Sequence, residues 1–304
     1  MYKLALVISL CTFSALNSYS QEKIDRHLTE KLKELTAPFH GEVGIYVENL
    51  TRGKVAILNA DTIFPTASMI KIPIMCGVFN KIELGDLAYN QKLIYKDSLL
   101  YPGEDILGSF KDGSEIYLNK VQMLSITTSD NTASLWLQTL AGGDSINSWL
   151  QSNGFAKTRL NSKIVARKLF RERYGWGQTT PREMANLLTR ISKGEVISRE
   201  ASERMYRNLS HIYWDEEALS QIPPYIQTAS KQGAVDQSRS EVVFVNAPHS
   251  KYVFCIITKN QKDTSWTSDN EGFKLIRDLS SLLWNYFEPK STWKPTTKIN
   301  KFSY

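Results

Sequence analysis

A short apolar stretch that begins with two chemically active side chains constrains this chain more than any other feature. From Met69 to Phe79 almost no polar face is left, which predicts a helix that protein must surround. Ser68 and Lys71 lie in the first turn of that helix, three residues apart and therefore side by side. A hydroxyl and an ammonium group at the end of a buried helix need an explanation.

One explanation is chemical. A serine is a poor nucleophile until a neighbouring base takes its proton, and a lysine whose pKa is lowered by burial could be that base. The helix N-terminus would also stabilise negative charge that develops near Ser68. The structural alternative is a helix start with a lysine that reaches solvent. The spacing alone does not decide, because Ser20 with Lys23 and Ser291 with Lys294 repeat it.

The first residues predict a signal peptide at 1–20. Lys3 supplies the charge, residues 4–16 form an apolar run, and the small residues Ser18 and Ser20 flank a cleavage site. The run is too short to span a bilayer, so we expect an exported protein, periplasmic or secreted, without stable membrane insertion. The 304 residues, 42% of them hydrophobic, are enough for one large domain or two lobes.

Charge and cysteine content exclude several partners. Removing residues 1–20 takes away Lys3 and no acid, so the net charge falls from +6 to +5, spread along the chain without a block suited to nucleic acid. Cys76 and Cys255 could pair, but buried free thiols are favoured. With only four scattered histidines, no zinc site and no cofactor are expected. We expect a monomer that binds a small molecule.

The order of the predicted elements indicates an α+β fold. Alternating or apolar runs predict strands near both ends of the chain, whereas helical patterns fill the middle. We expect one antiparallel sheet built from the N- and C-terminal strands and flanked by helices, with an inserted all-helical lobe and a cleft along the seam. The predicted strands are 41–48, 54–58, 225–232, 241–245 and 252–258; helices 22–35 and 270–287 flank them, and 158–178 is a long loop. The α/β lobe would comprise 21–62 and 212–288, the helical lobe 63–211, and a flexible tail 289–304.

Three groups of residues could meet at that seam: Ser68 with Lys71, the segment Ser129-Asp130-Asn131, and the segment Lys231-Gln232-Gly233. Their order and spacing resemble the class A β-lactamase and penicillin-binding-protein superfamily, whose motifs are Ser-x-x-Lys, Ser-Asp-Asn and Lys-Thr-Gly. The resemblance covers nearly the whole chain after residue 20. Ser-Asp-Asn alone is a weak signal, because it recurs out of order at 268–270. The ordered set is what is specific.

The resemblance implies a catalytic role for each matching position. Ser68 would be the acylated nucleophile and Lys71 its base partner. Ser129 would pass a proton to the leaving nitrogen, and Lys231 would hold the substrate carboxylate and tune Ser129. The backbone N–H groups of Ser68 and Ala234 would form the oxyanion hole.

Substrate contacts follow less directly. Asn131 matches the amide that holds the acylamido carbonyl of the substrate. Gln232 stands before Gly233 where the family usually has Thr or Ser; its amide can still donate to a carboxylate but fills more space. Arg239 is either a second carboxylate contact or an edge-strand charge. Tyr101 is either an aromatic wall of the cleft or a packed loop residue.

The long loop departs from the class A pattern. Ile164 stands where these enzymes carry the glutamate that activates the deacylating water, and the nearest loop carboxylate is Glu172, either a replacement base or a solvated charge. Loss of a general base typically costs about 10²–10⁴ in rate. We therefore expect a serine hydrolase that is acylated by a β-lactam or related amide or ester and deacylates slowly. The alternatives are a D,D-peptidase or other cell-wall hydrolase, and a non-catalytic binding module.

Overall fold

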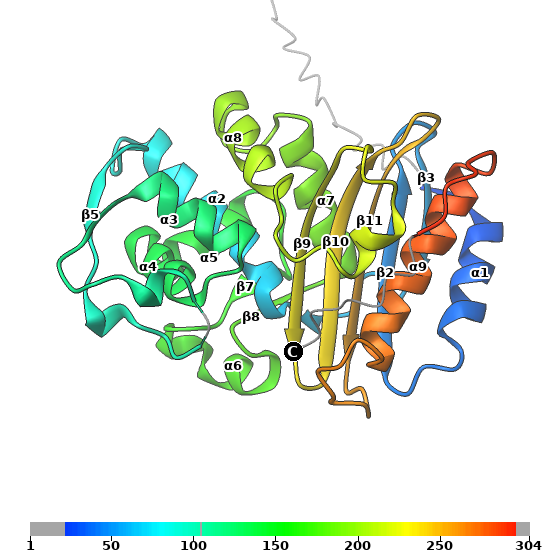
Figure 1. The fold of residues 1–304 in the computed structure, drawn as a ribbon, viewed down its shortest axis with the longest axis horizontal. Helices are drawn as coiled ribbons and strands as arrows, with labels where there is room; N and C mark the ends of the chain where they lie inside the picture. The colour runs from blue at the N-terminus through cyan, green and yellow to red at the C-terminus, as the bar shows by residue number, and fades with distance from the viewer. Residues whose placement is uncertain (1–21, 104, 296–304) are drawn as a thin grey trace, which may run out of the picture.

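The structure, a computed structural model, describes residues 22–103 and 105–295 (Figure 1). The signal peptide predicted at 1–20 and the part of the predicted tail at 296–304 lie outside the described residues. Trp293, within the predicted tail, packs against the hydrophobic core. No helix within the described ranges is long and apolar enough to cross a membrane.

A six-stranded sheet joins the two ends of the chain. Strands β2 and β3 form the expected hairpin, and β2 pairs with β11 near the C-terminus, with Ile45 opposite Ile256. Neighbouring strands are antiparallel except β1, which pairs in parallel with β3. The predicted α+β architecture is thus confirmed, with one short parallel exception. In spatial order the strands are β1 (Lys23–Ile24), β3 (Lys54–Leu58), β2 (Glu42–Asn49), β11 (Lys251–Lys259), β10 (Ser238–Asn246) and β9 (Thr228–Val235).

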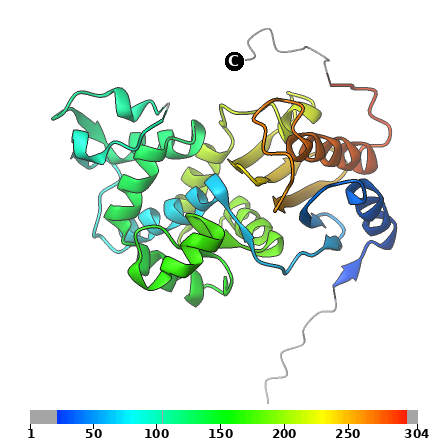
Figure 2. The same ribbon diagram turned by 90° about the horizontal axis from the view of Figure 1, so that it is seen from below.

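The sheet separates the hydrophobic core into two clusters, and successive side chains of β10 point to one cluster or the other. Val243 and Val245 face the cluster covered by α1 (Arg26–Thr36) and α9 (Glu271–Phe287), which lie together on one face of the sheet (Figures 1 and 2). Val242 and Phe244 face the cluster shared with the other helices. This period of two sends each β10 side chain to one layer or the other.

The helical lobe surrounds α2 (Lys71–Glu83), in which every residue from Lys71 to Phe79 is buried, as predicted. A Cβ atom on Gly77 would lie 2.4 Å from Ile146, so this glycine permits the close approach of α5. Cys76 in α2 and Cys255 in β11 are buried free thiols, the state that the sequence favoured. The other large helices are α3 (Leu118–Thr127), α4 (Asn131–Ala141), α5 (Gly143–Ser152), α7 (Pro181–Ser192) and α8 (Arg199–Leu209).

The segment 158–178, predicted as an irregular loop, contains regular structure. Strand β7 (Arg159–Leu160) opens it, a 3-10 turn (Val165–Arg167) leads into α6 (Lys168–Tyr174), and β8 (Gly177–Thr179) closes it. β8 lies between β7 and β4 (Phe64–Pro65), the strand just before Ser68, so the loop is attached to the chain that carries the candidate nucleophile. A separate pair, β5 (Lys92–Ile94) and β6 (Glu115–Tyr117), lies in the helical lobe.

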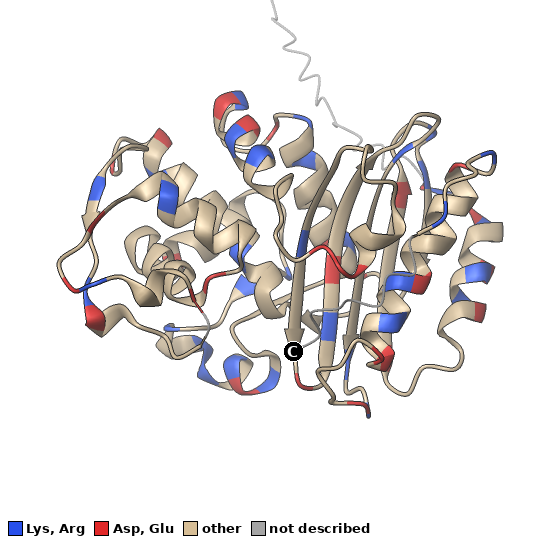
Figure 3. Ribbon diagram, in the orientation of Figure 1, with Lys and Arg blue, Asp and Glu red and all other residues tan. Residues whose placement is uncertain are grey.

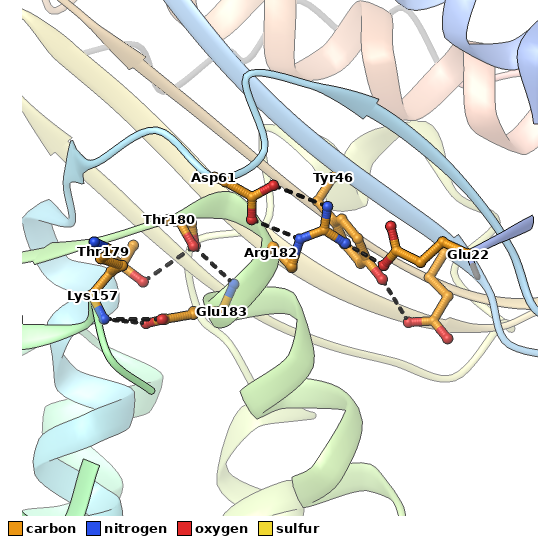
Figure 4. A network of polar contacts seen from close by, with 9 residues as sticks. Glu22, Tyr46, Asp61, Lys157, Thr179, Thr180, Arg182 and Glu183 are labelled. Carbon is orange, nitrogen blue, oxygen red and sulfur yellow. Dashed lines mark hydrogen bonds and ion pairs between the residues drawn. The ribbon is translucent and has the colours of Figure 1, made fainter. Parts of the chain in front are cut away.

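Helix α7 anchors the start of this segment. Thr180 caps the helix, and its Oγ1 accepts the Glu183 N–H at 3.1 Å. The Glu183 carboxylate does not reach back to the Thr180 N–H in a capping box. It accepts the N–H of Lys157 at 2.9 Å (Figure 4) and the N–H of Thr158 at 2.7 Å instead. The acid therefore ties the entry of the loop to the end of a buried helix.

Candidate active site

Ser68 lies in a short 3-10 helix, Ala67–Ile70, between β4 and α2. Ala67 has a φ of +44°, a backbone conformation that side chains rarely adopt and that is often found at functional sites. Strand β9 passes close by: a Cβ atom on residue 233 would lie 2.7 Å from the Ser68 nitrogen and 2.8 Å from the Thr66 carbonyl oxygen. Gly233 is thus needed so that the strand can reach the turn that carries Ser68.

Lys71 is fully buried, and its amine points at the turn before α4. Nζ donates to Ser129 Oγ at 3.0 Å, to Asn131 Oδ1 at 2.7 Å and to the Ser129 carbonyl oxygen. Burial lowers the pKa of Lys71 to about 7, although the carboxylates of Asp105 and Asp130 oppose this shift. Near neutral pH the amine can therefore exist unprotonated and accept a proton.

Asp130, between Ser129 and Asn131, holds the turn that carries these two residues. Ser129 has a φ of +59°, and Asp130 caps α4 by accepting the Ala133 N–H at 2.7 Å. The other Asp130 oxygen accepts the Leu107 N–H at 2.8 Å. Both Asp130 oxygens therefore accept backbone N–H groups, whereas the side chains of Ser129 and Asn131 accept from the amine of Lys71.

Asp105 is a supporting residue that sequence reasoning missed. Its Oδ2 accepts the N–H groups of Asn131 at 3.0 Å and Thr132 at 2.7 Å, and the Thr132 hydroxyl at 3.1 Å. It therefore holds the first turn of α4 and adds negative charge near Lys71. An acid in a loop-rich stretch gives no sequence signal for such a role.

Lys231 is the second buried amine at this turn. It lies on β9, the edge strand, and donates to Ser129 Oγ at 3.1 Å and to the Gln232 carbonyl at 2.9 Å. Burial, and then the charge of Lys71, hold the pKa of Lys231 well below its usual range. The hydroxyl of Ser129 thus accepts from two amines at once, which leaves its own proton free to be donated to a third group.

Of the sequence-predicted residues, Ser68, Tyr101, Asn131 and Ala234 line one cleft of about 630 Å³, and Lys71 donates to Asn131 at this lining. Among the described residues, Ser68 Oγ makes no direct hydrogen bond to either amine, and such bonds often tighten only when substrate binds. The arrangement offers a hydroxyl nucleophile, a candidate base and a serine that can relay a proton. These are the parts that acyl transfer requires.

Tyr101 and Trp176 line the same cleft from opposite segments. Their rings meet edge to face, with 5.2 Å between the centroids, so a helical-lobe loop touches the end of the 158–178 segment. Tyr101 thus lines the cleft and also packs against another loop residue, so both interpretations of this tyrosine stay open. Trp176 was missed, because the segment around it has no match in the motif set.

Gln232, whose amide was expected to bind a substrate carboxylate, is already engaged with a neighbouring residue. Its Oε1 accepts from Lys231 Nζ at 3.1 Å, so the amide partly satisfies the lysine that the resemblance reserves for a substrate carboxylate. A bound carboxylate would therefore compete with this internal contact.

Arg239 does not reach the cleft, so its predicted substrate contact is wrong. In β10 it shares a face with Val243, on the side covered by α9. Its guanidinium lies 4.6 Å and 4.5 Å from the ring centroids of Trp266 and Phe273 and donates to the Ser265 carbonyl at 2.7 Å. The next residue, Ser240, faces the site instead, with Oγ 3.3 Å from the Thr66 carbonyl oxygen.

Glu172 is also not a replacement base. It is exposed on α6 and does not line the cleft, although the next two residues do. Ile164, at the position where the resemblance expects glutamate, is 8% exposed and packs against Gly143, where a Cβ atom would lie 2.9 Å from the isoleucine side chain. An apolar contact thus takes the place of a carboxylate.

The fold is that of the β-lactamase/transpeptidase-like class of proteins. Within that class, the chain belongs to the beta-lactamase enzyme family, whose sequence model matches residues 27–287.

Individual relatives support the assignment. Beta-lactamase VEB-1 of Pseudomonas aeruginosa is 23% identical over 284 residues, 88% of this chain and 93% of the relative. Among solved structures, PBP-A is 25% identical, with a TM-score of 0.78 over 88% of this chain and 98% of its own. A beta-lactamase from Sphaerobacter thermophilus is also 25% identical, with a TM-score of 0.75 over 85% of this chain and 95% of its own.

Proposed function

We propose that this protein is an active-site serine hydrolase that is acylated on Ser68 by a β-lactam or a related amide or ester and releases the acyl group slowly. One observation carries the proposal. The amines of Lys71 and Lys231 lie 3.0 Å and 3.1 Å from the same Ser129 hydroxyl, at a cleft that Ser68 lines. Two buried amines that share a hydroxyl have no evident structural purpose, since burying each of them is costly.

Acylation would use groups already in position. The Ser68 oxygen attacks the substrate carbonyl carbon while its proton passes to the unprotonated amine of Lys71. The N–H groups of Ser68 and Ala234 stabilise the resulting oxyanion, an interaction typically worth about 10²–10³ in rate. The carbon–nitrogen bond then breaks, and the Ser129 hydroxyl gives its proton to the leaving nitrogen and takes one in return from the ammonium group of Lys71, 3.0 Å away.

Substrate would be held on both sides of the reacting carbonyl. Asn131 Oδ1 already accepts a hydrogen bond from Lys71 Nζ, which fixes the amide and leaves its Nδ2 donors for an acylamido carbonyl. Lys231, with Gln232 beside it, would bind the substrate carboxylate.

Deacylation would be slow because a water at the ester lacks a base. Ile164 cannot accept a proton, and Glu172 lies off the cleft. The ester on Ser68 would therefore persist until water attacks with only weak assistance.

A second candidate is a D,D-peptidase or another hydrolase of cell-wall peptides, for which a β-lactam is a mimic. Its support is the similarity to PBP-A, of which a Leu-to-Glu mutant was solved as an acyl-enzyme complex with penicillin G. For either activity we propose an exported monomer, since the sequence predicts a signal peptide at 1–20.

Intact-mass spectrometry during incubation with a chromogenic cephalosporin tests the proposal. Slow continuous turnover with a detectable adduct supports a slow β-lactamase, whereas a stoichiometric burst and a stable adduct support the peptidase. Ser68→Ala should abolish the adduct, and Ser240→Ala, a second serine beside the turn, should keep it. Failure of every lactam and activated ester to label Ser68 would leave a non-catalytic binding module.

A further inference from the structure

The most exposed apolar side chains near the cleft lie on the segment around α6. Val165 is 95% exposed, Leu169 76% and Phe170 44%, and no residue of α6 is buried. Val165 lies on the 3-10 turn that leads into α6, and Leu169 and Phe170 lie in the first turn of α6, so the three are close along the chain. Clustered exposed apolar groups mark a surface that interacts with something other than water.

The same segment is strongly basic. Residues 163–173 contain five cations, Lys163, Arg167, Lys168, Arg171 and Arg173, and one acid, Glu172. Figure 3 shows α6 as mostly blue with a single red band.

Most of this positive charge is available. Arg167 is used internally, since it donates to Asn161 Oδ1 at 2.7 Å and to Gln178 Oε1 at 2.9 Å. The ion pairs of the described ranges lie on other segments, so none neutralises Lys163, Lys168 or Arg171.

We propose that this surface docks the protein on an anionic lipid bilayer. We call it the loop face and define it by Lys163, Val165, Lys168, Leu169, Phe170 and Arg171. Cations that flank exposed apolar side chains match the lipid interface, where head groups meet the cations and acyl chains take the apolar groups. A soluble polyanion would use only the cations, and a second copy of the chain would bring like charges together. Of these three, only the lipid surface would bind both the cations and the apolar side chains of the loop face.

Docking in this way would orient the cleft. α6 lies at the lower edge of the molecule in Figure 1, away from α1 and α9. The residues at its C-terminal end, Arg173 to Trp176, line the cleft that holds Ser68. A protein held by the loop face would therefore present the mouth of its cleft close to the membrane surface, without a spanning helix.

Co-sedimentation of the purified full chain with vesicles tests the docking. We expect binding to vesicles of phosphatidylcholine with 30% phosphatidylglycerol, weakening as salt rises, and little binding to phosphatidylcholine alone. The pair Lys168→Gln/Arg171→Gln should weaken binding about twenty-five-fold, since each surface cation contributes about five-fold. The pair Val165→Ser/Leu169→Ser should weaken it about ten-fold or more.

A control pair makes the result specific. Lys111→Gln/Lys120→Gln removes two exposed cations from the helical lobe, far along the chain, and should change binding less than about two-fold. Thermal melting of each variant shows that it is folded. Absence of binding to the anionic vesicles, equal loss in the control pair, or no effect of the apolar pair would each overturn the proposal. The last result, together with equal binding to dextran sulfate, would show a polyanion site instead. None of these readouts depends on acylation of Ser68.

Discussion

The turn that carries Ser129 and the segment 158–178 both contribute residues to one cleft and are built in opposite ways. At the turn two buried amines converge on one hydroxyl, and Asp105 and Asp130 hold the backbone. In the loop segment the apolar Ile164 stands where a glutamate that activates water is expected, and the charged residues of α6 are exposed. The difference suggests that attack on a substrate is well supported and release of the product is not.

The largest effect should come from removing the candidate base. Lys71→Met keeps the length of the side chain but cannot accept a proton, so acylation should fall by about 10²–10⁴. Lys259→Met is the matched control, because this lysine lines the same cleft but is ion-paired with Glu42 at 3.1 Å. The time course of adduct formation measures both. Similar losses in the two variants would show that general cleft charge, and not proton transfer, drives acylation.

The reverse experiment builds the missing function into the loop. Ile164→Glu should speed deacylation at least ten-fold, because a carboxylate next to the ester can activate water. Ile164→Gln has the same shape without a base and should leave the rate unchanged. Both changes place a polar group in an apolar site, so each should lower stability by about 1–3 kcal/mol. Decay of a preformed adduct by mass spectrometry gives the rates, and equal rates for the two variants would contradict the assignment of Ile164 to this position.

The pH dependence of acylation tests the turn alone. The pKa of Lys71 is about 7 because burial disfavours its charged form, so the fraction of unprotonated amine rises with pH up to that value and then saturates. The acylation rate should increase about ten-fold per pH unit below 7 and level off above it. Lys71→Met should show no such rise. A rate that falls between pH 6 and 7 would mean that the protonated amine is the active form.

Much of the fold and of the candidate site could be predicted from the sequence, because both depend on the order of the motifs and on the periodicity of apolar residues. The strand 54–58 has the predicted bounds, and the buried helix behind Ser68 follows from an unbroken apolar run. The three motif segments were placed on one seam because terminal strands tend to share a sheet, which the pairing of β2 with β11 bears out.

The failures come from features that sequence patterns do not encode. Arg239 and Ser240 differ by one position, and the length of the turn between β9 and β10 decides which of them faces the cleft. A shift of one residue sends a strand side chain to the opposite face of the sheet. Asp105 and Trp176 act through contacts with distant segments, and nothing in their local sequence predicts those contacts.

A smaller effect should separate the anchoring of the loop from the chemistry of the turn. Glu183→Gln keeps the shape of the side chain but weakens its bonds to the Lys157 and Thr158 N–H groups, so the free energy of unfolding should fall by about 1–2 kcal/mol. Acylation should stay within about two-fold of wild type. Glu200→Gln, which only loses an exposed contact with Arg204, is the control and should melt within experimental error of wild type.

The smallest predicted effect concerns the contact between the rings of Tyr101 and Trp176, which both line the cleft. Edge-to-face rings of the kind formed by Tyr101 and Trp176 typically couple by about 0.5–1.5 kcal/mol. A double-mutant cycle with Tyr101→Leu and Trp176→Leu should show that coupling in the free energy of unfolding. If the two changes are simply additive, the walls of the cleft are independent, and the loop segment can move without disturbing the turn that holds Ser129. Coupling of the expected size would mean that opening the cleft for a bulky substrate must first break this contact, which would slow the entry of substrates too large to pass beneath the rings.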